Sequence, residues 1–195
     1  MANKVRFGLS NVHIARFTET NGNYIWEAPK ALPGAVSMSL DAEGDQSNFY
    51  ADNMAYYVVS TNNGYTGSLE MALLEDWFLE EYLGYVKDTN GNLVEDASLQ
   101  PKPFALLFQF EGDEKATKHC IYNVKPSRPG MEGETTEDSA EPATDEMEFT
   151  ATPINVNGRK FVKTKTTDET SEEIYDAWYK TAPTVPELVS DAEEG

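Results

Sequence analysis

Short stretches in which apolar and polar residues alternate constrain the fold of this chain more than any other feature. In Val36–Leu40 the apolar residues Val36, Met38 and Leu40 occupy every second position, and Met147–Ala151 repeats the pattern. Successive side chains of a β-strand point to opposite faces, so each stretch predicts a strand with one buried face. The sequence therefore predicts a mainly β protein built from antiparallel strands.

Turn residues divide the other strand-like stretches into predicted hairpins. The predicted pairs are residues 56–61 with 65–71, 85–86 with 93–94, and 104–110 with 118–124. Asn62-Asn63-Gly64 and Asn90-Gly91 are the expected turns of the first two, because Asn and Gly tolerate the positive φ that tight hairpins need. Residues 5–17 are also predicted to be extended, with a bend near Gly8 and Asn11.

Two helices are predicted. Residues 74–83 carry four large apolar side chains at spacings of three and four, and Gly84 follows as a stop signal. Residues 171–179 begin at the capping-box spacing of Thr170–Glu173. Their apolar positions share one predicted face, made by Ile174, Ala177 and Trp178.

The length of 195 residues is that of one ordinary domain. We expect a single domain over residues 1–182 and an acidic tail over residues 183–195. Two polar segments, residues 41–53 and 126–146, are predicted to be long loops, and loops of this length are usually functional or disordered.

Charge excludes several functions. The chain has 34 acidic and 15 basic residues, a formal net charge of −19, and no Lys or Arg between Ala31 and Val86. A nucleic-acid-binding surface needs clustered Lys and Arg, so non-specific DNA binding is not expected.

No apolar run approaches the ~20 residues of a membrane span, and no secretory signal is recognisable. Cys120 is the single cysteine, which fits synthesis in a reducing cytosol.

Residues with catalytic or metal-binding chemistry form no convincing motif. His119 and Cys120 are neighbours on a predicted strand and would point to opposite faces, and a structural role is expected for His13. Asp41-x-Glu43-x-Asp45 lacks the full spacing of an EF-hand loop. The basic run Arg159–Lys165 is predicted to be an exposed strand that pairs with acidic groups. We therefore expect no enzyme activity, no cofactor and no metal.

Seven short segments occur in a distinctive order. They are Ala31–Leu40, Asp41–Asp45, Phe49–Asn53, Asn63–Met71, Arg128–Gly130, Glu141–Asp145 and Phe149–Pro153. In this order the chain resembles the major tail proteins of long-tailed phages that infect Gram-positive bacteria. The resemblance extends from about Val5 to Trp178, and its specificity lies in the order of the segments, because none of them carries chemistry.

The resemblance implies a sandwich-like or barrel-like tail tube fold flanked by a helix. Six copies would form a ring with a continuous inner β-barrel, and stacked rings would form the tube that conducts the genome. It implies as partners further copies of the chain and the tape-measure, tail-completion and distal tail proteins, with viral DNA passing through without specific binding. The protein would be made in the bacterial cytoplasm and reside in the virion, without a membrane contact.

Two sets of residues are our predicted contact sites. Small or acidic outward positions on the alternating strands are expected to face the lumen: Ser37, Ser39, Asp41, Glu70 and Glu148. The segment Asp41–Asn53 is expected to be an arm that reaches a neighbouring ring through Glu43, Asp45, Phe49 and Tyr50. The alternative for this segment is a loop folded back on its own domain.

Other functions stay open at this point. A carbohydrate-binding or adhesin-like β-sandwich would need an exposed aromatic platform, for which Trp26 is the available tryptophan, since Trp77 and Trp178 lie on predicted helices. An acidic DNA mimic would bind a basic host protein and would not polymerise. An enzyme is the weakest alternative, because only the adjacent His119 and Cys120 support it.

Overall fold

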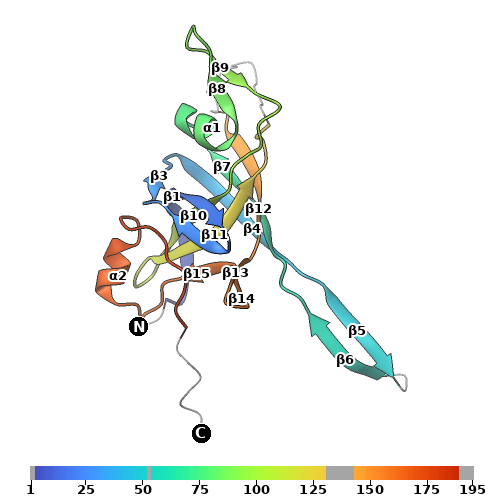
Figure 1. Cartoon of the computed structure of the whole chain (residues 1–195). Coiled ribbons are helices and arrows are strands. Elements are labelled where there is room, and N and C mark those ends of the chain that lie inside the picture. The colour runs from blue at the N-terminus through green and yellow to red at the C-terminus, as the bar shows by residue number, and fades with distance from the viewer. Residues whose placement is uncertain (1–2, 52–53, 131–142, 189–195) are drawn as a thin grey trace, which may run out of the picture.

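The computed structural model of the chain describes residues 3–51, 54–130 and 143–188. Antiparallel strands dominate it, and two short helices lie at its periphery (Figure 1). In chain order the elements are β1 (Arg6–Thr20), β2 (Asn23–Trp26), β3 (Lys30–Ala31), β4 (Ala35–Glu43), β5 (Gln46–Ala51), β6 (Met54–Ser60), β7 (Gly64–Met71), α1 (Asp76–Tyr82), β8 (Tyr85–Lys87), β9 (Leu93–Glu95), β10 (Phe104–Gly112), β11 (Thr117–Pro126), β12 (Asp145–Ala151), β13 (Ile154–Val156), β14 (Arg159–Phe161), β15 (Lys163–Lys165) and α2 (Glu172–Ala177). The predicted mainly β fold is confirmed.

One large antiparallel sheet organises the molecule. Its strand order is β2-β1-β10-β11-β12-β7-β4, with β3 added to β1 and β15 added to β11. Three separate hairpins complete the fold: β5–β6, β8–β9 and β13–β14. Two hairpins predicted from the sequence are confirmed, because β10 pairs with β11 and β8 pairs with β9.

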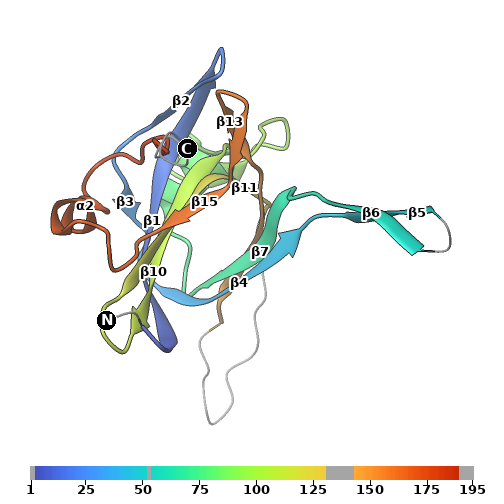
Figure 2. The same ribbon diagram turned by 90° about the horizontal axis from the view of Figure 1, so that it is seen from below.

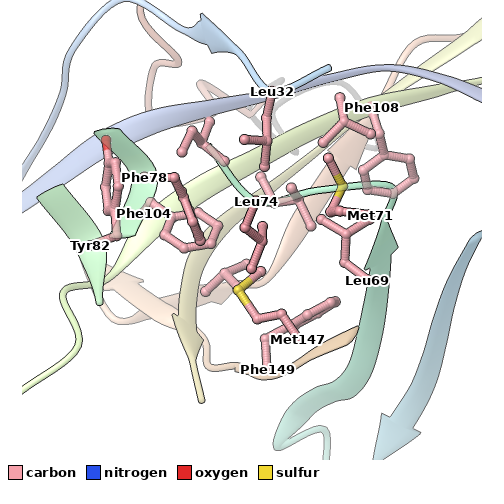
Figure 3. Close-up of a cluster of buried hydrophobic side chains, with 14 of the residues drawn as sticks. Leu32, Leu69, Met71, Leu74, Phe78, Tyr82, Phe104, Phe108, Met147 and Phe149 are labelled. Atoms are coloured by element: carbon pink, nitrogen blue, oxygen red, sulfur yellow. The ribbon is translucent and has the colours of Figure 1, made fainter. Parts of the chain in front are cut away.

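Two hydrophobic cores lie on opposite faces of β10. Phe104, Leu106 and Phe108 face the first core, where they meet side chains of β7, β12 and α1 (Figure 3). Ala105 and Leu107 face the second core, which contains Trp26 and side chains of the C-terminal segment. Each fully buried large apolar side chain contributes about 1.5–3 kcal/mol. Burial on both faces explains why Phe104–Phe110 is a nearly continuous apolar run rather than an alternating one.

Helix α1 closes one end of the first core. Leu74, Phe78 and Tyr82 are buried at the predicted spacing of four, and the rings of Phe78 and Tyr82 stack with their centroids 5.4 Å apart. The helix ends at Tyr82, and Gly84 follows with φ +82°, the left-handed conformation of a helix stop. The prediction of a helix at residues 74–83 is confirmed, although its regular part is shorter.

Helix α2 lies where the sequence predicts it, but it is less buried than expected. Its N-cap is Ser171, whose Oγ accepts a hydrogen bond from the backbone N–H of Ile174 at 3.4 Å, so the cap lies one residue after Thr170. No residue of the helix is buried, and Ile174 is 57% exposed. Ile174, Ala177 and Trp178 lie on one side of the helix, as predicted, and Trp178 packs against the second core. Ile174 itself is not buried there, and Tyr175 adds a contact through its hydroxyl group, which donates to the carbonyl oxygen of Ala116.

The predicted hairpin around Asn62-Asn63-Gly64 is wrong. The strand β6 pairs with β5, and β7 pairs with β4 and β12, so these three residues connect two successive strands of one long hairpin. The chain reverses between Ala51 and Met54, which pair with each other. The segment 41–53, predicted to be a loop, is consequently mostly strand, and it belongs to β4 and β5.

Three smaller differences concern local structure. Val36 was expected in the core but is 52% exposed, because a register shift between Ala35 and Ser37 takes it out of the alternation. The basic run 159–165 is two strands, β14 and β15, separated by buried Val162. The predicted bend of β1 is confirmed by register shifts near Gly8 and Asn11, both at positive φ.

The predicted division into a domain of residues 1–182 and a tail of residues 183–195 stays a prediction. Val185 packs against the second core, and residues 189–195 lie outside the described part of the chain. The predicted loop 126–146 is bounded by the end of β11 at Pro126 and the start of β12 at Asp145, and its residues 131–142 are not described.

Candidate assembly surfaces

The five residues predicted to face a lumen share one face of three adjacent strands. Across β4 and β7, Ser37 is opposite Glu70 and Ser39 is opposite Ser68; Ser68 in turn is opposite Glu148 of β12. The other face of these strands is buried in the first core through residues such as Leu69. We call the outward side the acidic face, defined by Ser37, Ser39, Asp41, Glu70, Glu146 and Glu148. The fold therefore brings the five predicted residues together on one surface.

Hydroxyl groups hold the carboxylates of the acidic face in place. Ser37 Oγ donates to Glu70 Oε2 at 2.7 Å, and Thr144 Oγ1 donates to Glu70 Oε1 at 2.8 Å. These two hydrogen bonds, Ser37 first, lower the pKa of Glu70 below its usual range. Thr66 Oγ1 similarly donates to Glu43 Oε1 at 2.9 Å. The Glu70 carboxylate is therefore ionised at neutral pH.

An open groove crosses the acidic face between β7 and β12. Asp41, Glu146 and Glu148 contribute carboxylates to its lining, together with hydroxyl groups such as that of Ser68. None of the described residues that line it is basic. A phosphate group would meet only like charge there. This chemistry does not suit nucleic-acid binding.

The strand β4 forms a free edge of the large sheet. Among the residues that the structure describes, it is last in the strand order and pairs on one side only, with β7. Such an edge presents unpaired backbone N–H and C=O groups and is a ready template for another strand.

The hairpin β5–β6 projects from the body of the molecule. In both views it extends away from the sheets as a continuation of β4 and β7 (Figures 1 and 2). Backbone hydrogen bonds from Thr61 to Asp45 and from Asn63 to Glu43 continue the pairing to its base. We call residues 46–60 the arm.

The predicted inter-ring residues lie along this projection. Glu43 ends β4 and Asp45 precedes the arm, and both are exposed. Phe49 and Tyr50 lie on β5, in the arm itself. The alternative of a loop folded back on its own domain does not hold for the arm, because within the described part of the chain its strands pair only with each other and extend away from the body (Figures 1 and 2). The function of these residues stays a prediction.

The histidines and the cysteine have structural surroundings. Cys120 is 2% exposed, and burial raises the pKa of its thiol. On the opposite face of β11, the His119 ring stacks on Phe108 with centroids 5.1 Å apart, and burial, aided by nearby cations, lowers its pKa to about 4. His13 Nδ1 lies 2.9 Å from the carbonyl oxygen of Asn11. The expected separation of His119 from Cys120 is confirmed.

Neither a metal site nor a membrane-spanning helix is found within the described ranges. Among residues 3–51, 54–130 and 143–188, no three His, Cys, Asp or Glu side chains gather as a metal site would require. In the same part of the chain, neither helix has the length and apolar character of a membrane span. Trp26, the candidate sugar platform, is 6% exposed and donates its Nε1–H to the carbonyl of Tyr122 at 2.9 Å.

Sequence reasoning missed two parts of these surfaces. The hydroxyl residues Thr66 and Ser68 lie between the carboxylates of the acidic face, and their alternation with Leu69 and Met71 was a usable signal. The second strand of the arm, β6, pairs with β5, whereas the sequence predicted that it would pair with residues 65–71. An open sheet edge and an unsupported hairpin are typical of β proteins that complete their structure by contact with other chains.

Comparison with known proteins identifies the family. A family model described as "Phage tail tube protein" matches residues 2–189, so this chain belongs to the phage tail tube protein family. It is accordingly a structural component of a phage tail. No match was found among curated protein sequences.

Two solved structures are distantly similar. One is a chain of the anti-feeding prophage tube-terminating cap, with a TM-score of 0.49, 12% identity, and coverage of 86% of this chain and 95% of that chain. The other belongs to the anti-feeding prophage baseplate, with a TM-score of 0.44, 12% identity, and coverage of 85% and 97%.

Proposed function

We propose that six copies of this chain close into a ring, and that stacked rings form the tube through which the phage genome passes. The observation that carries the proposal is the combination of a free β4 edge with an outward acidic face on the same three strands. Ring closure by a heterologous contact would cover the edge in every copy. The inner strands would then continue from one copy to the next as a barrel.

In this proposal the acidic face lines the lumen, with Asp41, Glu70 and Glu148 toward the DNA. Six copies at −19 each bring a formal charge of −114 to every ring. Duplex DNA carries one negative charge per ~1.7 Å. A wall of like charge would let the DNA slide without binding it.

The arm supplies the contact between rings, with Glu43 and Asp45 at its base and Phe49 and Tyr50 within it. The tube ends would meet the tape-measure, tail-completion and distal tail proteins. The chain would be synthesised in the cytoplasm of the host bacterium, and it would carry no catalytic activity or cofactor. Burial of Trp26 speaks against the adhesin-like alternative.

Negative-stain electron microscopy of the purified full chain tests this function. We expect rings or tubes at high protein concentration, with a central channel. Size-exclusion chromatography in parallel reports the dissociated monomer. A protein that stays monomeric at every concentration and salt condition would contradict the proposal and would favour an inhibitor or adhesin.

A further inference from the structure

Asparagine is followed by glycine at four places in this chain: Asn21-Gly22, Asn63-Gly64, Asn90-Gly91 and Asn157-Gly158. This step is chemically labile, because glycine has no side chain to hinder attack of its backbone nitrogen on the side-chain carbonyl carbon of the asparagine. All four asparagines are exposed to solvent. Sequence and exposure therefore do not distinguish the four steps, whereas the backbone around them does.

Two of the steps form open hairpin turns. Asn21-Gly22 joins β1 to β2 and Asn157-Gly158 joins β13 to β14, and in both turns the Asn and the Gly have positive φ. This is the conformation of a two-residue type I′ turn, in which the flanking residues make the closing hydrogen bonds. Among the described residues, neither Gly22 nor Gly158 has a hydrogen-bond acceptor for its backbone N–H. A Cβ at either glycine would meet no described atom within 4 Å, so both turns have room to rotate.

The nitrogen of Gly64 is held in place. Its N–H donates to Asn62 Oδ1 at 3.0 Å. Gly64 is also buried, and it lies so close to Ala151 that a Cβ would stand 1.9 Å from the carbonyl oxygen of that residue. The nitrogen must break its hydrogen bond, and the strands must separate, before Gly64 can turn toward the side chain of Asn63.

The nitrogen of Gly91 is held by a second arrangement. Its N–H donates to the carbonyl oxygen of Asp88 at 3.1 Å. The Asp88 carboxylate fixes the rest of the turn, because its Oδ1 accepts from the backbone N–H groups of Asn90 and Asn92, both at 2.8 Å. Attack on the Asn90 side chain therefore requires this network to open first.

We propose that Asn21 and Asn157 are sites of spontaneous deamidation, and that the fold protects Asn63 and Asn90. In the reaction the glycine nitrogen loses its proton to a solvent base and attacks the asparagine Cγ. The C–N bond of the side-chain amide breaks, ammonia leaves, and a cyclic succinimide forms. Water then opens the ring at either carbonyl, which gives aspartate or, when the main chain passes through the side chain, isoaspartate. Water is the co-reactant, and no electron is transferred.

The two reactive sites lie in adjacent hairpins. Asn155 of β13 donates its backbone N–H to Tyr24 Oη of β2 at 3.0 Å, and Figure 2 shows both turns on the same side of the molecule. Each deamidation adds a negative charge there to a chain that already carries −19. Each isoaspartate also inserts a methylene group into the main chain of a tight turn, which strains the strand pairing beside it. The charge and pairing of this region therefore change with time, whether or not copies assemble.

Peptide mapping of the aged full chain tests the assignment. The folded protein is incubated in mildly alkaline buffer made with water enriched in the heavy isotope of oxygen, and a matched sample is incubated in urea. Mass spectrometry measures the oxygen label in the peptide that contains each asparagine, and an isoaspartate methyltransferase detects isoaspartate. The urea sample is the control, because there all four steps lose the backbone environment that distinguishes them.

We expect Asn21 and Asn157 to deamidate about tenfold or more faster than Asn63 and Asn90 in the folded protein, because the latter two must first open locally. In urea all four should react at similar rates. Equal rates at the four sites of the folded protein would overturn the inference. So would a lack of reaction at Asn21 and Asn157 while the urea sample reacts.

Asp88→Ala tests the cause of the protection at Asn90. The substitution removes the side-chain acceptor beside Asn90, so the rate there should rise toward that of Asn21. Asn63 in the same variant should stay slow, which reports that the body remains folded. An unchanged slow rate at Asn90 would overturn the protective role of the Asp88 network.

Discussion

At the scale of single residues, Gly67 shows how closely β4, β7 and β12 approach. A Cβ atom at this position would lie 2.3 Å from the carbonyl oxygen of Ser39 and 2.8 Å from the ring of Phe149. The oxygen belongs to the backbone of β4 and the ring belongs to the first core. Neither can move without disturbing the three strands that carry the acidic face.

Gly67→Ala should therefore destabilise the monomer by about 1–3 kcal/mol, the usual cost of overpacking. Gly130→Ala is the control, because a Cβ there meets no atom of the described residues within 4 Å. Urea unfolding followed by tryptophan fluorescence measures both variants. Equal stability of the two variants would contradict the close approach of the strands.

The alternation of apolar and polar residues correctly predicted which side chains are buried and which are exposed at most positions of β4, β7 and β12. Met147 and Phe149 are buried, and Glu148 is exposed, as period two requires. Val36 failed because a bulge is not visible in a polarity pattern. Glu70, Glu148 and Ser37 share a face because β7 lies between β12 and β4 in the sheet. This strand order cannot be predicted from the local sequence pattern of each strand.

At the scale of elements, the arm shows why one turn signal was misread. Asn62-Asn63-Gly64 is composed of residues that favour turns, and Gly64 does adopt φ +113°. However, glycine is needed at this position because the strands approach closely: a Cβ would lie 1.9 Å from the carbonyl oxygen of Ala151. The reversal falls instead between Ala51 and Met54, where the sequence offers Asp52-Asn53. Both segments contain residues that suit turns, so the pairing partners of the strands decided where the chain reverses.

One buried lysine helps to hold helix α2 to the sheet. Lys118 Nζ donates to the carbonyl of Tyr175 at 2.7 Å and lies 3.7 Å from the centroid of its ring. Burial lowers the pKa of this ammonium group. Since α2 buries none of its own residues, contacts of this kind provide much of its attachment.

Lys118→Met should loosen α2 without unfolding the body. Loss of a charged hydrogen bond and a cation–π contact costs about 1–3 kcal/mol, so amide exchange in α2 should accelerate about tenfold or more. Exposed Lys180→Met removes the same charge and is the control. Hydrogen exchange read by mass spectrometry distinguishes the two; unchanged exchange in Lys118→Met would show that α2 is anchored elsewhere.

At the scale of the whole molecule, net charge should govern assembly. Each chain carries −19, so close packing of copies stores repulsion that dissolved ions screen. The Debye length falls from ~30 Å at 0.01 M salt to ~3 Å at 1 M. We expect light scattering by assembled protein to rise with NaCl. A fall would mean that attraction between opposite charges dominates the contacts.

Charge reversal on the acidic face should affect DNA passage more than assembly. Replacing Asp41, Glu70 and Glu148 by Lys adds two charge units at each position, about +36 per six-copy ring, and creates phosphate-binding groups. Tubes should form while DNA ejection slows, whereas the neutral Asn and Gln replacements should eject normally. Ejection is followed by dye uptake with adsorption as the control. A normal rate in the Lys variant would place these residues outside the lumen.

The central claim is that the strands β4, β7 and β12 form the inner wall of a tube. A cryo-electron microscopic reconstruction of tubes assembled from the full chain tests it most directly. The account predicts six copies per ring, β4 of each copy paired with its neighbour, and Asp41, Glu70 and Glu148 directed at the axis. A reconstruction with the acidic face on the outer surface, or with the β4 edge unpaired, would contradict it.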